Sequence, residues 1–181
     1  MRLGDHFKHI RKKYHNIFFS GISFDHRKIK KNYIFFAVKG NNSDGNNFIP
    51  LAIKKGCKII VTEKNFDEWK NGVLFINTKN IRKLLAQISF SIFKKKPNNL
   101  IAVTGTNGKS SVSDFYYQIL RLNNKKVASI GTLGVRSNNF NLNLFNTTID
   151  PIYLGKILNE LKKRKIENVI MEASSHGLHQ N

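Results

Sequence analysis

A short apolar run that breaks into a glycine loop is the feature that most constrains this chain. Residues 100–103 are apolar and bounded by turn residues, which predicts a buried strand. After the loop, apolar residues recur at helical spacing, at Val112, Phe115, Tyr116, Ile119 and Leu120. The segment between them, residues 104–111, reads TGTNGKSS. The order strand, glycine loop, helix is typical of a phosphate-binding turn in an α/β fold.

The loop carries the groups that phosphate binding requires. Gly105 and Gly108 allow the backbone to turn N–H groups toward an anion, and the helix that follows adds a partial positive charge at its N-terminus. Lys109 is suited to reach the outer phosphates, and Ser110 to hold a magnesium ion. The spacer between the two glycines, residues 106–107, is shorter than in the usual nucleotide loop. A tight strand-to-helix turn without a ligand is therefore the alternative.

The charge of the chain is unusual for a globular protein. Lysine and arginine number 31 against 11 acidic residues, which gives a formal net charge of +20 at pH 7 and favours anionic partners. A basic module that binds nucleic acid is thus one alternative function. The basic residues are spread along the sequence, however, and form runs only at residues 94–96 and 162–165. We expect no nucleic-acid partner.

Cysteine content and hydropathy indicate the cellular compartment of the protein. Cys57 is the single cysteine, which excludes a disulfide framework and a zinc cluster and fits a reducing compartment. No apolar stretch approaches the roughly 20 residues of a membrane helix, and the basic N-terminus lacks the core of a signal peptide. We expect a cytoplasmic protein without membrane insertion.

The remaining pattern predicts two α/β units with a break near Pro97, where residues 94–99 hold no apolar side chain except the proline ring. The predicted domains are therefore 1–97 and 98–181. In the first, we expect helices near 2–13, 48–55 and 81–92, and strands at 17–19, 33–38, 58–62 and 73–76. In the second, we expect strands at 127–130 and 168–171, an irregular stretch before 146–148, and a helix from Pro151 that Asp150 caps.

Several polar residues follow predicted strands, where ligands of parallel sheets gather. Glu172 ends the last strand and is suited to ligate magnesium, although a solvated glutamate would have the same pattern. Residues 146–148 (NTT) can hold an anion or simply build a turn. Residues 25–27 (DHR) can pair with one another or grip a phosphate. His176 beside two serines does not indicate a serine hydrolase, because catalytic partners are rarely neighbours in sequence.

Taken together, these motifs resemble the Mur ligase family. The resemblance lies in residues 104–111, 130–134 (IGTLG), 146–148 and 171–178 (MEASSHGL), in this order. The shortened glycine loop is the form that this family uses. The first half agrees through residues 25–27, 33–40 (YIFFAVKG), 43–45 (SDG) and 48–53 (FIPLAI), which are similar to the family's UDP-binding domain. The resemblance thus covers nearly the whole chain.

The resemblance implies a fold, a reaction and a set of site residues. The fold is an N-terminal α/β UDP-binding domain followed by the first part of a mostly parallel, P-loop-type α/β ATPase domain. The reaction joins a diamino acid, diaminopimelate or lysine, to UDP-N-acetylmuramoyl-L-alanyl-D-glutamate, using ATP and Mg²⁺ to form an acyl phosphate during peptidoglycan synthesis. The implied residues are Lys109 and Glu172 for catalysis; Gly105, Thr106, Asn107, Gly108, Lys109, Ser110 and Ser111 for ATP; Ser110, Glu172 and His176 for the metal; and Phe24, His26, Asn41, Asn42, Ser43, Asn146, Thr147, Thr148, Ser174 and Gln180 for the muramoyl substrate.

The resemblance ends within the family's central domain. We therefore expect an N-terminal piece of a longer, monomeric ligase, and expect these 181 residues alone to bind weakly, to turn over nothing and to aggregate through an exposed sheet edge. In this family, the residues that select the diamino acid lie outside the part that this chain resembles. Another Mur ligase or a folylpolyglutamate-type ligase is the alternative within the class.

Overall fold

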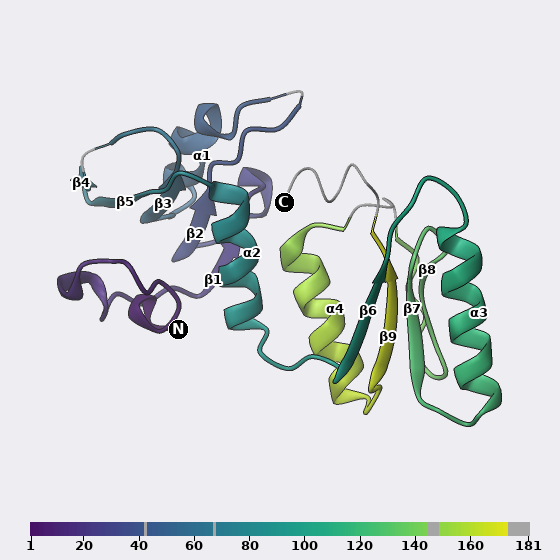
Figure 1. The fold of residues 1–181 in the computed structure, drawn as a ribbon. Helices are drawn as coiled ribbons and strands as arrows, with labels where there is room; N and C mark the ends of the chain where they lie inside the picture. The colour runs from purple at the N-terminus through teal and green to yellow at the C-terminus, as the bar shows by residue number, and fades with distance from the viewer. Residues whose placement is uncertain (42, 67, 145–148, 174–181) are drawn as a thin grey trace. The chain divides into compact units, whose positions relative to one another are not determined.

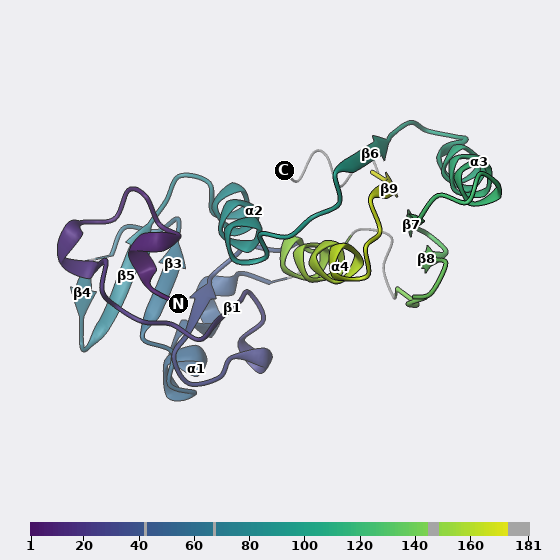
Figure 2. The same ribbon diagram turned by 90° about the horizontal axis from the view of Figure 1, so that it is seen from below.

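The computed structural model describes residues 1–181 with the exception of 42, 67, 145–148 and 174–181. The chain divides into two compact units, Met1–Ile92 and Phe93–Asn181. Each unit has its own sheet with helices packed on it (Figures 1 and 2). The mixed α/β fold with mostly parallel sheets is the one that the sequence predicts, and it is confirmed.

The first unit is built on a five-stranded sheet of order β1-β2-β3-β5-β4. Its strands are β1 (Gly21–Ser23), β2 (Tyr33–Phe36), β3 (Ile59–Thr62), β4 (Trp69–Lys70) and β5 (Val73–Asn77). All neighbours pair in parallel except β4, which runs antiparallel to β5. The helices are α1 (Ile49–Lys54) and α2 (Ile81–Ile92), and short 3-10 turns lie at Leu3–Asp5, Lys12–Tyr14, His26–Lys28 and Gly45–Phe48.

The core of the first unit lies on both faces of this sheet. On one face Phe35, Ile60 and Phe75 pack with Ile49 and Ala52 of α1. Successive strand residues point to opposite faces, so Ile34 and Phe36, neither of them exposed, occupy the other face. The central strands are therefore covered from both sides, as parallel strands require.

The second unit contains a four-stranded sheet of order β6-β9-β7-β8. Its strands are β6 (Asn99–Val103), β7 (Val127–Gly131), β8 (Gly134–Ser137) and β9 (Asn168–Glu172), and its helices are α3 (Lys109–Leu122) and α4 (Pro151–Lys163). β6, β9 and β7 are parallel, whereas β8 returns antiparallel to β7. The helices α3 and α4 lie on opposite faces of the sheet (Figure 2). None of the described helices is both long and apolar enough to cross a membrane.

Four local expectations are wrong. The basic segment 2–13 forms no α-helix, because Leu3 and Phe7 are buried singly at turns instead of forming one helical face. Residues 17–19 contribute only an isolated bridge between Arg2 and Phe18, and the edge strand is β1 instead. The stretch after Gly134 is a regular strand, β8. β6 is a strand but is mostly exposed, because β9 is its one neighbour among the described residues.

Candidate functional site

The glycine loop connects β6 to α3 at the carboxyl edge of the second sheet. Gly105 and Gly108 have φ values of 149° and 79°, a region that favours glycine. A Cβ added at Gly108 would meet no atom within 4 Å, so the backbone at the start of α3 faces open space. The first N–H groups of an α-helix have no partner within the helix, and here they are accessible to an anion. The loop therefore has the geometry of a phosphate cradle.

Lys109 folds over this loop instead of extending away from it. Its Nζ donates to the carbonyl oxygens of Gly105, at 2.6 Å, and of Thr106, at 3.2 Å. Both bonds are exposed to solvent, so Lys109 Nζ can exchange these carbonyl partners for phosphate oxygens without disturbing a buried contact. The ammonium group is thus held at the loop itself, where it can balance the charge of an anion.

Ser110 and Glu172 meet at the same edge of the sheet. The register of the parallel strands places Val103 of β6 beside Glu172 of β9, and the N–H of Ala173 donates to the carbonyl of Val103 at 2.8 Å. This pairing brings the Glu172 carboxylate to the start of α3, where Ser110 Oγ donates to its Oε2 at 3.0 Å. Glu172 is therefore not a freely solvated strand end, which was the alternative interpretation of the sequence.

A hydroxyl and a carboxylate are oxygen ligands of the kind that Mg²⁺ prefers. Among the described residues, no group of three or more His, Cys, Asp and Glu side chains is placed to hold a metal ion. This sparse donor set fits a magnesium ion that keeps water and phosphate oxygens as its other ligands. The predicted ligand His176 lies outside the described residues, as do Asn42, Asn146, Thr147, Thr148, Ser174 and Gln180.

Thr132 and Gly131 belong to the site, although the sequence did not identify them as site residues. Thr132 Oγ1 also donates to Glu172 Oε2, at 3.1 Å. A Cβ on Gly131 would lie 2.2 Å from Glu172 Oε1. The carboxylate therefore occupies space that a side chain at position 131 would fill. Both residues lie 40 positions or so before Glu172 in the sequence. Their motif was visible in residues 130–134, but nothing local indicated that it faces Glu172.

The predicted uridine-end residues lie at the carboxyl edge of the first sheet. Phe24 and His26 follow β1, whereas Asn41 and Ser43 follow β2, and these strands are parallel neighbours. The His26 ring stacks on Phe48, with centroids 4.2 Å apart and an interplanar angle of 11°. Phe48 is a further aromatic residue at this edge that the sequence did not single out. The loops that hold the predicted contacts are thus brought to one edge of one sheet.

Asp25 and Arg27 pair with each other beside His26. Two hydrogen bonds of 3.0 Å join the guanidinium to the two carboxylate oxygens, and the N–H of Arg27 donates to Asp25 Oδ1 at 2.9 Å. The hydrogen bond from Arg27 lowers the pKa of Asp25 below its ordinary value. Of the two interpretations that the sequence left open, the structure shows the internal pair, which organises the turn after β1.

Comparisons with known proteins agree with this architecture. Residues 18–91 match the catalytic domain of the Mur ligase family, and residues 103–181 match the Mur ligase middle domain. The UDP-N-acetylmuramoyl-L-alanyl-D-glutamate--2,6-diaminopimelate ligase of Rickettsia conorii is 41% identical over 92% of this chain and 35% of its own length. The ligase of the same name from Fusobacterium nucleatum is 39% identical over 88% of this chain and 33% of its own length.

Solved structures show the same fold. A structure of a UDP-N-acetylmuramoyl-L-alanyl-D-glutamate--2,6-diaminopimelate ligase matches with a TM-score of 0.82 at 24% identity, over 99% of this chain and 37% of that one. The MurF ligase of Thermotoga maritima in complex with ADP matches with a TM-score of 0.55 at 22% identity, over 85% of this chain and 32% of that one. The chain spans about a third of the length of the curated relatives it matches. The two matched domains account for most of its residues, and the chain belongs to the Mur ligase family.

Proposed function

We propose that this chain provides the UDP-substrate domain and the ATP-phosphate cradle of a ligase that adds diaminopimelate to UDP-N-acetylmuramoyl-L-alanyl-D-glutamate. The observation that carries the proposal is the meeting of the glycine loop, Lys109, Ser110 and Glu172 at one edge of the second sheet. The names of the relatives that are 39–41% identical support this substrate pair. They also favour diaminopimelate over lysine, a choice that the sequence left open.

The reaction that we propose transfers the γ-phosphoryl group of ATP to the free side-chain carboxylate of the D-glutamate residue. The amino group of diaminopimelate then attacks the acyl phosphate, an amide bond forms, and inorganic phosphate leaves. Phosphoryl transfer depends mainly on positioning and on neutralisation of charge. These are the tasks for which the loop of this chain is built.

Each residue of the site has a task in this reaction. The N–H groups of the glycine loop hold the phosphate chain, and Lys109 exchanges its carbonyl partners for phosphate oxygens as the charge develops. Ser110 and Glu172 would hold Mg²⁺, which supplies Lewis-acid neutralisation of the phosphate oxygens when it is bound. Phe24, His26, Asn41 and Ser43 would bind the uridine end of the substrate at the other sheet. We assign Asn146, Thr147, Thr148, Ser174 and Gln180 to its muramoyl-peptide end, as the resemblance implies.

The chain's single cysteine fits a reducing compartment. Cys57 is buried in the first unit, with its sulfur 3.1 Å from the carbonyl oxygens of Tyr33 and Ile59. Burial raises the pKa of its thiol to about 11, so the group stays protonated and is neither a nucleophile nor a metal ligand. We therefore propose that the reaction takes place in the cytoplasm, where we also place its nucleotide substrates.

The test is ligation by the full-length ligase that carries these residues, with Lys109→Ala as the variant. We expect kcat to fall by roughly 1,000-fold, because the charge on the transferred phosphoryl group is left without its ammonium partner. The acyl phosphate is trapped with hydroxylamine, and the hydroxamate should disappear together with ligation. Lys125→Ala removes an exposed lysine beyond α3 and should leave both unchanged. Near-normal ligation by Lys109→Ala would contradict the proposal, and faster use of lysine than of diaminopimelate would contradict the substrate.

A further inference from the structure

The Glu172 carboxylate is held by two hydroxyl groups from separate elements. Ser110 Oγ, at the start of α3, donates to Oε2 at 3.0 Å, and Thr132 Oγ1, after β7, donates to the same oxygen at 3.1 Å. Among the described residues, Oε1 accepts no hydrogen bond. Two hydroxyl groups therefore fix one oxygen of the carboxylate, and Oε1 has no hydrogen-bond donor within the described part of the chain.

The β7–β8 hairpin fixes the position of Thr132. Thr132 and Leu133 form the turn between Gly131 and Gly134, which pair across the hairpin. Gly134 has a φ of 89°, and a Cβ there would lie 2.4 Å from the carbonyl oxygen of Leu142. The turn therefore requires glycine at this position, and its conformation is set by the packing of β8 and the segment beyond it. Thr132 is placed by the sheet instead of by a free loop.

Gly131 completes this arrangement from the backbone side. A Cβ on Gly131 would lie 2.2 Å from Glu172 Oε1 and 2.4 Å from the carboxyl carbon. Gly131 has no left-handed φ that would otherwise explain the residue. Its role is therefore to leave room for the carboxylate, which lies against β7 between this backbone and the hydroxyl of Thr132.

We propose that Thr132 is a positioning residue for the metal site, which holds Glu172 in place while Ser110 and Glu172 present oxygen atoms to a cation. The inference rests on the proposed function, since it assumes that Ser110 and Glu172 are metal ligands. A serine hydroxyl has two lone pairs and one O–H group, so Ser110 can direct a lone pair toward a metal and still donate to Glu172 Oε2. The Thr132 hydroxyl is a second donor, from a different element, and two donors from separate elements keep the carboxylate from rotating. Such outer partners of metal ligands change metal affinity by about 10- to 100-fold.

The test compares Thr132→Val with Thr132→Ser in the full-length ligase that carries these residues. Valine keeps the shape of threonine and removes the hydroxyl, whereas serine keeps the hydroxyl. Leu133→Ala is the matched control, because Leu133 lies in the same turn and is 66% exposed. Binding is measured with Mn²⁺ and ADP as probes: water-proton relaxation reports the Mn²⁺ ternary complex, and ³¹P NMR reports ADP without metal. Circular dichroism checks that each variant is folded.

We expect Thr132→Val to raise the Mn²⁺ concentration for half-saturation by about 10-fold while metal-free ADP binding changes less than about 2-fold. Thr132→Ser and Leu133→Ala should behave as the wild type. A Thr132→Val protein with wild-type Mn²⁺ binding overturns the inference and leaves the proposed function standing. Equal losses with and without metal overturn it as well, because they indicate a general structural role. A wild-type full-length ligase whose ADP binding does not respond to Mn²⁺ overturns the metal site of the proposed function and this inference with it.

Discussion

Two strands of similar composition, β3 in the first unit and β6 in the second, have opposite surroundings. Ile60 of β3 is 0% exposed, whereas Ile101 of β6 is 40% exposed. β3 pairs with β2 and β5 on its two sides and has packed side chains on its faces, whereas among the strands that the structure describes β6 pairs only with β9. Apolar side chains make both segments strands, but their neighbours decide how deeply each one is buried.

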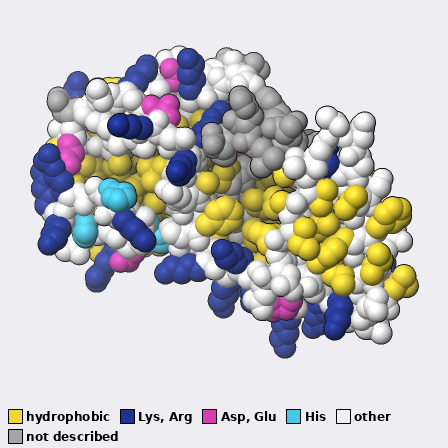
Figure 3. All heavy atoms as spheres, viewed as in Figure 1, with side chains coloured by type: hydrophobic (Ala, Val, Ile, Leu, Met, Phe, Trp, Pro, Cys, Tyr) yellow, Lys and Arg dark blue, Asp and Glu magenta, His cyan; other side chains and the backbone are white. Residues whose placement is uncertain are grey.

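Helices of the two units differ in burial in the same way as these strands. In the first unit, α2 buries Ile81, Leu85 and Ile88. In the second, α3 buries only Ser113 and Tyr117, and its larger apolar side chains face outward (Figure 3). These exposed residues are Val112, Phe115, Ile119 and Leu122. The phosphate loop therefore lies between a strand and a helix that are both thinly covered.

This contrast has a consequence for the site. The distance between the glycine loop and Glu172 is set by the pairing of β6 with β9, a single ladder at the edge of the sheet. His26 also follows an edge strand, β1, but Ile22 and Ser23 of that strand are buried, whereas β6 is mostly exposed. We therefore expect the first unit to be the more stable of the two, and the phosphate site to depend on the pairing of β6 with β9.

The same substitution, isoleucine to alanine, made separately in β3 and β6 should give the largest difference in the free energy of unfolding. Ile60→Ala should lower the free energy of unfolding of the first unit by about 3 kcal/mol, because it leaves a cavity in a filled core. Ile101→Ala should cost about 1 kcal/mol or less, because its side chain is already partly in water. Trp69 is the single tryptophan of the chain, so its fluorescence during urea unfolding reports the first unit, and circular dichroism reports the whole chain. Equal losses at the two positions would show that the difference in burial has no energetic meaning.

The sequence predicted elements whose signals are local. The apolar face of α2 and the Asp150 cap of α4 are examples, since Asp150 Oδ1 accepts the N–H of Tyr153 at 2.9 Å. β1 and β8 were missed because they are short and hold only Ile22 and Val135 as large apolar residues. The spacing of apolar residues in α3 gave a helix correctly, but spacing cannot say which face of the helix the sheet covers.

The same distinction between local and distant signals applies to the candidate site. Gly105, Lys109 and Ser110 could be predicted because their chemistry lies in one continuous loop. Thr132 could not, because its hydrogen bond to Glu172 joins residues 40 positions apart through the register of β7 and β9. The role of Gly131 is likewise a matter of space beside another strand, which no local pattern records.

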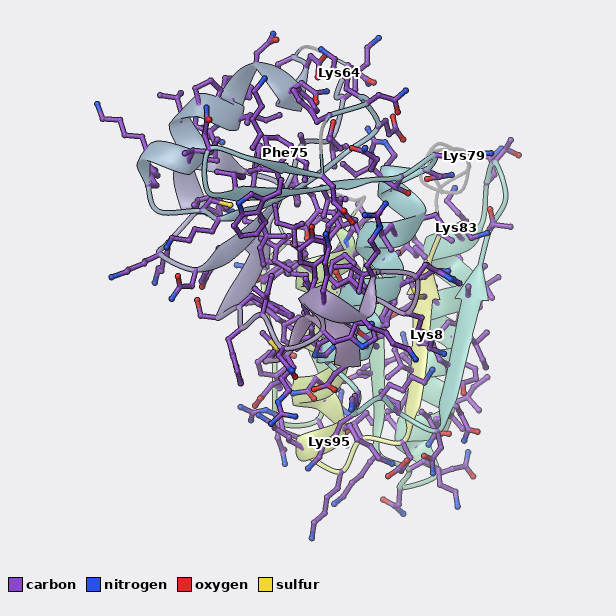
Figure 4. The ribbon with its side chains drawn as sticks, turned by 90° about the vertical axis from the view of Figure 1, so that its left-hand side faces the viewer. Lys8, Lys64, Phe75, Lys79, Lys83 and Lys95 are labelled. Atoms are coloured by element: carbon purple, nitrogen blue, oxygen red, sulfur yellow. The ribbon has the colours of Figure 1, made fainter. Side chains whose placement is uncertain are left out.

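The charges of the first unit offer a second and smaller test. Figure 4 shows Phe75 inside this unit, whereas Lys64, Lys79 and Lys83 point outward, so most of its lysines lack a buried role. Asp25 differs, because its pair with Arg27 lowers its pKa. A carboxyl group with a lowered pKa in the folded state stabilises the protein above its ordinary pKa, near 3.8, and this contribution is lost as the pH falls through the folded value.

Asp25→Asn should therefore lower the stability of the first unit at pH 7 by about 1 kcal/mol or less, since asparagine still caps the turn but cannot form the ion pair. As the pH falls below about 3.8 and through the lowered pKa of the folded state, the wild type and the variant should converge, since the wild-type carboxyl becomes protonated there. Urea unfolding followed by Trp69 fluorescence between pH 3 and pH 7 measures both effects. An unchanged gap across this range would mean that the charge of Asp25 contributes nothing to the first unit.

The smallest effect on stability, and the sharpest on behaviour, should come from the exposed face of α3. Phe115→Glu and Leu122→Glu replace side chains that are 63% and 81% exposed, so each should change stability by only about 0.5 kcal/mol. Both should reduce the self-association that we expect of this chain, because they interrupt an apolar stripe in water. Leu51→Glu, at an isolated 47% exposed leucine of α1, is the matched control in the first unit and should leave self-association unchanged. Sedimentation velocity over a range of concentrations distinguishes the cases. If Leu51→Glu reduces association as much as the α3 variants, the thin cover of the second unit is not what makes the chain associate, and net charge alone explains its solubility.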